Sequence, residues 1–458
     1  MSSPPPLPSA THLQPRPKII VLDDDPTGSQ TVHSCLLLLL WDVDTLRLGL
    51  RDDSPIFFVL TNTRSLPPSE AEAVTREVCR NLQEAIALES IHNFLIVSRS
   101  DSTLRGHYPL ETDAIAQELG PFDAHFLVPA FLEGGRITCH SNHYVRIDGH
   151  DIPVHHTEFA RDPLFAFHHS YLPDYVEEKT KGKILATAIA RLQRSDLQAG
   201  CLDQLRQLQN NQCVVVDGEV QADLDCFATA ILTAVSEGKR FLFRSAASLL
   251  TALVQLPPQP VSPEAMATLT RQGKPGVVLA GSYTAKTTRQ LERLRQRPDV
   301  QGVEVDIAAL MQTDDATALL EGAIAQINTL HQQGQGVVVY TSRQAITCEE
   351  AAQQLALSHR VTAFLNDIGR NLPETTGFLI CKGGNTANTT LSHALTLQSV
   401  RLLGQLVPGC CIVRTAADHD RFPLLPVVMF PGNVGDEATL AIAYQRLTPQ
   451  PFSSVFEQ

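Results

Sequence analysis

The stretch IIVLDDDPTGSQT, residues 19–31, decides the fold of this chain. A short apolar run ends in three consecutive aspartates and then in a turn that contains Pro and Gly. A second stretch, FLIVSRSDSTLRGHYP at residues 94–109, repeats the design with arginines, an aspartate and hydroxyl residues after the apolar run. Each is typical of a buried strand that ends in a polar loop. In open α/β sheets ligands bind at the carboxyl ends of the strands, so both stretches predict a functional site.

Apolar runs alternate with helical patterns along the whole chain. This alternation predicts an α/β fold with two α/β domains, mainly parallel sheets flanked by helices, and an active-site cleft between the domains. Ser69 and Glu72 have the spacing of a capping box, which predicts a helix over residues 69–89. Strands are expected at 18–22, 35–40, 56–60, 93–98, 125–129, 213–217, 240–244, 276–280, 303–307, 337–341, 378–382, 411–414 and 427–430.

A chain of 458 residues is long enough for two or three domains. The segment LPPQPVSP at residues 256–263 holds four prolines and cannot continue a helix or a central strand. The expected division is a flexible tail at 1–17, a first domain at 18–255, a linker at 256–272 and a second domain at 273–458.

The composition excludes several classes of function. A formal net charge of -13 disfavours binding to nucleic acid or to anionic membranes. No apolar run approaches the ~20 residues of a membrane helix, and the ten cysteines show no CxxC pair. A cytoplasmic protein with reduced thiols is therefore expected, and a homo-oligomer is compatible with it. The His-rich segment from 134 to about 182 is expected to form a long excursion over the site.

The aspartates at 23, 24 and 25 directly follow a predicted strand. Three adjacent carboxylates repel one another, so at least one is expected to be partly protonated or to be held by a cation or Mg2+. A carboxylate with a raised pKa can serve as a general base, whereas a single Asp could also simply cap a helix. The pattern also fits a haloacid-dehalogenase-like phosphatase that uses Asp23 and Asp25, although GDEATL at 435–440 has Leu where that family's second metal-binding Asp belongs.

The segment SRSDSTLRG at 98–106 combines groups that recognise a small polyhydroxy acid. A guanidinium binds a carboxylate through two parallel hydrogen bonds, and Asp and Ser side chains can bind neighbouring hydroxyls. The alternative is a solvated loop with an Arg–Asp ion pair. The candidate substrate-binding residues on this side of the molecule are Asp24, Thr27, Arg99, Ser100, Ser102 and Arg105.

Three glycine-containing loops follow strands in the second half: GSYT at 281–284, KGGNT at 382–386 and PGNVG at 431–435. Glycine lets backbone amides approach phosphate oxygens, and a following helix adds the positive end of its dipole. A nucleotide phosphate site is therefore predicted, without a Walker or GxGxxG motif. Its candidate residues are Ser282, Lys382, Gly383, Gly384, Asn385, Thr386, Gly432, Asn433 and Gly435.

With these motifs in view, the chain resembles the four-carbon acid sugar kinase family over nearly its whole length beyond residue 17. The motifs that carry the resemblance are DDDPTGSQT, SRSDSTLRGHYPLE, HHTEFARDP, GSYT, KGGNT and FPGNVGDE. The third of these adds His156 and Asp162 to the candidate substrate-binding residues.

The resemblance implies an ATP-dependent kinase that phosphorylates erythronate, threonate or 3-oxo-tetronate. It places the sugar acid on the N-terminal domain, with Asp25, Thr27, Arg99, Asp101, Ser102 and Arg105. It places ATP on the C-terminal domain, with Ser282, the 383–386 loop and Gly432. Asp25 or Asp101 would be the catalytic base, and Mg2+ would bridge the phosphates through ligands that the sequence does not identify. A two-domain sensor that binds sugar acid or nucleotide without catalysis remains the alternative from another class.

Overall fold

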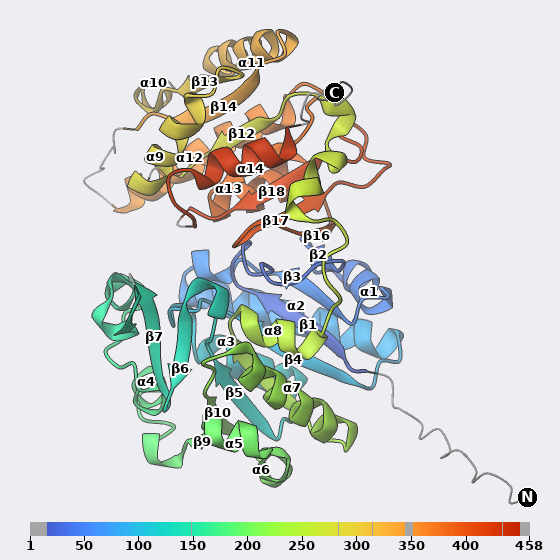
Figure 1. Cartoon of the computed structure of the whole chain (residues 1–458), viewed down its shortest axis with the longest axis vertical. Coiled ribbons are helices and arrows are strands. Elements are labelled where there is room, and N and C mark those ends of the chain that lie inside the picture. The colour runs from blue at the N-terminus through green and yellow to red at the C-terminus, as the bar shows by residue number, and fades with distance from the viewer. Residues whose placement is uncertain are drawn as a thin grey trace, which may run out of the picture.

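The computed structural model describes residues 16–147, 149–282, 284–313, 315–343, 351–432 and 434–448. The chain forms two halves, each a mostly parallel sheet covered by helices, which meet at the strands β2, β16 and β17 (Figure 1). Within the described residues one sheet of 15 strands runs through both halves in the order β13-β14-β12-β15-β18-β17-β16-β2-β3-β1-β4-β11-β5-β10-β9. The predicted α/β class is confirmed.

The N-terminal half contains the parallel strands β2, β3, β1, β4, β11, β5, β10 and β9 in spatial order. Their central members are apolar on both faces because helices cover both faces of the sheet. The strands are β1 Lys18–Asp23, β2 Leu36–Leu38, β3 Ile56–Leu60, β4 Phe94–Arg99, β5 Ala124–Val128, β9 Ala190–Leu192, β10 Gln212–Val216 and β11 Phe241–Ser245. The helices are α1 Val43–Arg51, α2 Pro68–Leu88, α3 Leu110–Leu119, α4 Leu172–Lys179, α5 Arg194–Ala199, α6 Leu202–Gln207, α7 Gln221–Ser236 and α8 Ala247–Val254.

The C-terminal half repeats this plan around parallel strands β13, β14, β12, β15 and β18, with antiparallel β17 and β16 at the junction. The strands are β12 Val277–Ala280, β13 Val300–Val305, β14 Gly336–Thr341, β15 Leu379–Lys382, β16 Ser399–Val407, β17 Cys410–Arg414 and β18 Pro426–Phe430. The helices are α9 Ala285–Arg295, α10 Ile307–Gln312, α11 Thr317–Gln332, α12 Ala351–Arg370, α13 Gly384–Thr389 and α14 Thr439–Leu447.

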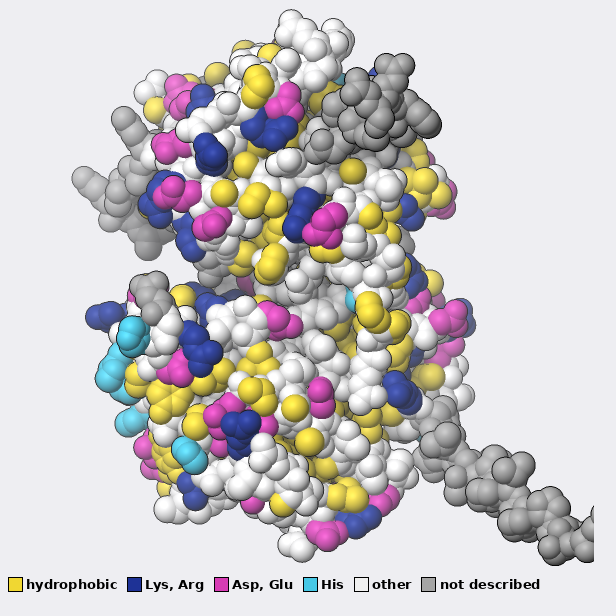
Figure 2. Space-filling view, viewed as in Figure 1, with side chains coloured by type: hydrophobic (Ala, Val, Ile, Leu, Met, Phe, Trp, Pro, Cys, Tyr) yellow, Lys and Arg dark blue, Asp and Glu magenta, His cyan; other side chains and the backbone are white. Residues whose placement is uncertain are grey.

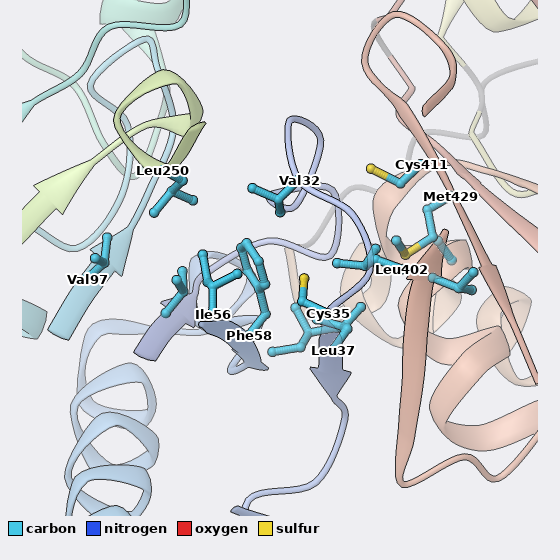
Figure 3. Packing of buried hydrophobic residues seen from close by; sticks show 14 of the residues in the cluster. Val32, Cys35, Leu37, Ile56, Phe58, Val97, Leu250, Leu402, Cys411 and Met429 are labelled. Carbon is cyan, nitrogen blue, oxygen red and sulfur yellow. The ribbon is translucent and has the colours of Figure 1, made fainter. Parts of the chain in front are cut away.

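The two halves share backbone pairing and an apolar core. Strand β2 pairs in parallel with β3 and in antiparallel with β16, which joins the two sheets. One buried cluster includes Val32, Cys35 and Leu37 from the N-terminal half and Leu402, Cys411 and Met429 from the C-terminal half (Figure 3). Burial of this cluster removes apolar surface of both halves from water, so the junction contributes to stability.

One local expectation needs correction, and a second gains structural detail. The helix over 69–89 exists as α2, but it begins at Pro68 after Pro67 and has no side-chain cap, so Ser69 and Glu72 do not form a capping box. Proline needs no hydrogen bond at the first helical position, which explains this start. The excursion after residue 134 also contains a three-stranded antiparallel sheet, made of β6 Arg136–Cys139, β7 Asn142–Ile147 and β8 His150–Pro153.

No helix in the described residues is long and apolar enough to span a membrane. The cytoplasmic location stays a prediction.

Candidate functional site

The acid loop, defined here as residues 23–31, leaves the carboxyl end of β1. Because β3, β1, β4 and β11 are parallel neighbours, their polar ends meet at one edge of the sheet. Arg64 lies just beyond β3, while Arg99 and Ser245 end β4 and β11. The structure therefore brings the two polar loops of the N-terminal half together, as their positions after strands predict.

Asp24 is the buried anchor of this group. Its Oδ1 accepts from Arg64 Nη2 at 2.6 Å, and its Oδ2 accepts from Ser100 Oγ at 2.7 Å. Arg244 Nη2 lies 3.9 Å from the same Oδ2, and Nη1 of Arg244 forms a buried ion pair with Glu111 Oε2 at 2.6 Å. Asp24 thus binds both Ser100 and Arg64. This arrangement favours a role for Asp24 and Ser100 in holding the loops in place.

Asp25 is less enclosed, with about a quarter of its side chain exposed (26%). Burial raises its pKa, but Arg64 at 3.5 Å and hydrogen bonds from Thr27 outweigh burial and hold the pKa below its usual range. Both the amide and the hydroxyl of Thr27 donate to Asp25 Oδ1. Thr27 therefore orients Asp25, which is ionised at neutral pH and accessible.

Asp23 is fully buried, with Arg99 Nη1 3.6 Å from its Oδ1. Burial, and to a smaller extent the neighbouring aspartates, raise the pKa of Asp23 to about 8 against the opposing effect of Arg99. This direction agrees with the expectation that at least one carboxyl of the cluster is partly protonated. A Cβ atom at Gly28 would overlap the Asp23 carboxylate, so only glycine fits there. The phosphatase alternative requires an accessible nucleophile at Asp23, and the structure does not provide one.

We expect Asp23→Asn to change the pH dependence of stability. The folded pKa of about 8 lies above the ordinary Asp value of about 4. The carboxyl therefore contributes stability that is fully present below pH ~4 and is lost as the pH rises through about 8. Asn does not titrate, so the free energy of unfolding of the variant, relative to the wild type, should increase between about pH 4 and about pH 8. Denaturant unfolding of both proteins across that range measures the difference, and a constant difference would contradict the prediction.

Asp101 and Arg105 face each other within the loop between β4 and α3, which is called the second polar loop here. Arg105 Nε donates to Asp101 Oδ2 at 2.7 Å, and Thr103 also donates to that oxygen. Burial raises the pKa of Asp101, but Arg64 and Arg105 outweigh it and hold the pKa well below its usual range. Arg105 also lies 3.7 Å from Asp162 and 5.0 Å from the centre of the Phe159 ring. The HHTEFARDP segment thus reaches the site through Asp162.

The remaining substrate-side candidates divide into two groups. Arg99 and Ser102 are buried at the site, where Arg99 lies against Asp23 and the carbonyl oxygen of Ser102 is 2.7 Å from His143 Nε2. His156 is exposed, and its ring is tilted against that of His155 with ring centres 3.9 Å apart. It lies on the excursion where histidines gather at one edge of the N-terminal half (Figure 2). No described contact joins His156 to the acid loop.

The three glycine-containing loops also converge, because β12, β15 and β18 are adjacent parallel strands. Thr284 caps α9, Ser282 Oγ lies 3.0 Å from Thr287 Oγ1, and α13 begins at Gly384. A Cβ on Gly281 would lie 2.5 Å from Thr386 Oγ1, and one on Gly432 would lie 3.3 Å from Ser282 Oγ.

The other members of this set are placed around the same loops. Asn385 donates to Thr362 at 3.3 Å, and Gly383 and Gly435 have φ values of +120° and +77°. Such φ values favour glycine. Asn433 lies outside the described residues.

Lys382 is buried beneath these loops. Its Nζ donates to the carbonyl oxygens of Pro431 and Gly432 at 2.6 and 3.2 Å and lies 4.2 Å from the centre of the Phe430 ring. Burial lowers the pKa of Lys382 to about 7. These contacts favour a role in joining two loops, and direct contact with a phosphate stays a prediction.

The acid loop of one half meets a glycine loop of the other. A Cβ built on Gly384 would lie 3.7 Å from Asp25 Oδ2 and 3.7 Å from Pro26 Cγ. Two further contacts hold this arrangement, since Gln405 donates to the Gln30 carbonyl and Cys411 donates to that of Ser29 at 3.3 Å. The outline of the molecule is indented where the halves meet (Figure 2). An ionised carboxylate therefore lies beside the start of a helix that is suited to phosphate.

Sequence reasoning missed Arg64, Arg244 and Glu111. Arg64 was detectable in principle, because TNTR directly follows the predicted strand at 56–60, next to the one that carries Asp23. Arg244 and Glu111 form a buried pair that only the packing of α3 on β11 reveals.

Comparison with known proteins agrees with this division of the site. Residues 19–253 match a family described as a sugar-binding N-terminal domain, and residues 277–440 match one described as a nucleotide-binding C-terminal domain. The chain belongs to the four-carbon acid sugar kinase family. This family membership argues against the alternative that the chain is a haloacid-dehalogenase-like phosphatase.

Two relatives in the family carry names for their activity. A D-erythronate kinase from Heliobacterium modesticaldum is 28% identical over 309 residues, which are 64% of this chain and 64% of the relative. A D-threonate kinase from Salmonella typhimurium is 25% identical over 439 residues, which are 93% of this chain and 97% of the relative.

Two solved structures share the fold. One, from Salmonella typhimurium and provisionally described as a tRNA synthase, has a TM-score of 0.68 at 19% identity and covers 94% of this chain and 99% of its own. The other, from Haemophilus influenzae, has a TM-score of 0.63 at 17% identity and covers 93% and 100%. At these identities the likeness shows the fold alone.

Proposed function

We propose that this protein is an ATP-dependent kinase that phosphorylates a hydroxyl of a four-carbon sugar acid of the erythronate, threonate or 3-oxo-tetronate type. The observation that supports it most is the position of Asp25, beside Gly384 of the opposite half. A kinase needs its acceptor-binding and nucleotide-binding groups next to each other, since phosphoryl transfer depends mainly on alignment and charge neutralisation. The names of the two relatives point to the same substrate class.

In this proposal each half binds one substrate. On the N-terminal half the sugar acid lies among Asp25, Asp101 and the nearby arginines, with Thr27, Asp24 and Ser100 orienting those groups. On the C-terminal half the phosphates of ATP lie against the backbone of the 383–386 loop and Gly432, near the Ser282 hydroxyl. Lys382 holds these loops together from below.

The reaction joins the acceptor hydroxyl oxygen to the γ-phosphorus while the bond from that phosphorus to the leaving oxygen of ADP breaks. Asp25, which is ionised at neutral pH, receives the hydroxyl proton. Mg2+, when bound, would neutralise charge on the phosphates. Within the described residues no three His, Cys, Asp or Glu side chains group as a metal cage. Because Mg2+ in phosphoryl-transfer sites usually keeps several waters and binds substrate phosphates, we expect the ion to be held chiefly by the phosphates and by water.

The deciding experiment mixes the full chain with ATP, Mg2+ and a panel of four-carbon acids and measures ADP and the phosphorylated acid. A kinase releases one ADP for each acid phosphorylated. A sensor would bind without producing ADP, and that result with every acid would refute the proposal.

Ser282→Ala tests the nucleotide side. Loss of a hydroxyl that hydrogen-bonds a charged phosphate should raise KM for ATP by about tenfold and leave KM for the sugar acid unchanged. Steady-state kinetics with each substrate varied in turn measures both. Thr268→Ala, which removes an exposed hydroxyl bonded only to the Ala265 carbonyl, serves as the control. An unchanged KM for ATP in Ser282→Ala would remove that hydroxyl from the ATP site.

A further inference from the structure

The arginines around the site differ in whether a carboxylate accompanies them. Arg64, Arg99, Arg105 and Arg244 each have a carboxylate oxygen within 4.0 Å. Among the described residues no carboxylate comes that close to Arg136. Its Nη1 donates to the Gly134 carbonyl, and its Nε is buried without a hydrogen-bond partner.

The small sheet fixes Arg136 beside the second polar loop. On β6, Thr138 Oγ1 lies 2.9 Å from Nδ1 of His143 on β7, and the other ring nitrogen of His143 is 2.7 Å from the Ser102 carbonyl oxygen. Successive side chains of a strand alternate, so Arg136 shares the face of Thr138. That face is directed at the loop that carries Asp101 and Arg105.

The electrostatic surroundings of Arg136 agree with this position. Burial lowers the pKa of Arg136, with Asp101 acting in the opposite direction and Arg105 in the same direction. A cation that is removed from water without a counter-ion is unfavourable. Asp101, the carboxylate whose charge acts on Arg136, is already engaged by Arg105 and Thr103. The site therefore holds positive charge that an incoming anion can neutralise.

We propose that Arg136 binds the carboxylate of the sugar acid and selects acids over neutral sugars of the same length. This inference rests on the proposed function and names the group that recognises the acid. Arg105 is less suited to this task, because Asp101, Asp162 and the Phe159 ring already hold its guanidinium. Arg99 is less accessible, because it is almost fully buried against the Asp23 carboxyl group.

The test measures binding by calorimetry without ATP, so that it does not depend on turnover. Wild type and Arg136→Gln are titrated with D-erythronate, D-threonate and 3-oxo-tetronate, and then with the neutral amide of the acid that binds best. Loss of a charge-assisted contact should weaken binding of the acid by about a hundredfold and leave binding of the amide within about threefold. Arg146→Gln on β7, whose arginine is exposed and paired with Asp151, is the matched control.

The outcomes separate this inference from the proposed function. If Arg136→Gln binds the acid as the wild type does, or if the wild type binds no four-carbon acid, the inference is wrong. If the wild type binds the acid through Arg136 but releases no ADP with it, the inference stands and the kinase proposal fails. If thermal unfolding shows that Arg136→Gln is not folded, Arg136→Lys decides, because it keeps the charge and loses the paired geometry. It should weaken acid binding by about tenfold, and wild-type binding would overturn the inference.

Discussion

Asp25→Asn is expected to lower kcat by about 10^2- to 10^4-fold, because Asn keeps the shape of the side chain but cannot receive the hydroxyl proton. KM for both substrates should change little, since Thr27 can still orient the amide oxygen. Rapid-quench or steady-state measurement of phosphorylated acid gives kcat directly. The pKa of Asp25 lies below its usual range, so Asp25 stays ionised down to the ordinary Asp value of about 4. Protonation of Asp25 should therefore not reduce the kcat of the wild type until the pH falls below about 4.

Two comparisons make this result decisive. Asp151→Asn on the exposed β7–β8 hairpin should retain full turnover. Asp101→Asn tests the competing base, because Asp101 also lies at the site with a low pKa. Full turnover in Asp25→Asn together with a large loss in Asp101→Asn would assign the base to Asp101.

Arg64→Met is expected to lower the free energy of unfolding by about 3 to 5 kcal/mol. The guanidinium is the partner of buried Asp24 at 2.6 Å and of Asp25 at 3.5 Å, and its removal leaves carboxylates uncompensated. Urea denaturation at neutral pH measures the loss. Arg80→Met, which breaks an exposed pair with Glu118, should change the same free energy by less than about 1 kcal/mol.

The pH dependence gives an independent check on Arg64→Met. In the wild type the folded pKa values of Asp25 and Asp101 lie below the unfolded value, so these groups contribute stability above pH ~4 that is lost as the pH falls through the folded values. Arg64 is the main charge behind both shifts. The stability difference between the proteins should therefore shrink in acid, and a difference that does not vary with pH would show that Arg64 acts only through packing.

Much of the fold was predictable because apolar runs bounded by turns determine strands locally. The strand expected at 56–60 is β3, and the one expected at 18–22 is β1 with one more residue. Strand β16 was missed, because SVRLLGQLV combines apolar and polar residues with a glycine, and because one of its two partners, β2, lies more than 350 residues away in the sequence. The small sheet was missed because its short strands, RITC, NHYVRI and HDIP, mix apolar and polar residues without a long apolar run.

The sequence predicted which polar residues follow the strands that carry Asp25 and Asp101, but it did not predict the ion pairs and hydrogen bonds that connect these residues. Asp25 and Asp101 follow the ends of two neighbouring parallel strands, so they lie at the same edge of the sheet. The partners of those aspartates depend on which side chains meet across strands, and local patterns do not contain that information. Lys382 illustrates the limit, because its sequence position suggests a phosphate contact whereas the packing directs its ammonium to two carbonyl oxygens.

The pairing of β2 with β16 has a consequence for protein engineering. A chimera that exchanges substrate domains between two relatives would naturally be joined in the proline-rich segment near residue 260. Such a hybrid would still need Leu36–Leu38 of one parent to match Ser399–Arg401 of the other, together with the ion pair between Arg401 and Asp52. The exchangeable unit is therefore the domain plus the facing edge of β16, and hybrids that also transfer this edge should fold better than those divided only along the chain.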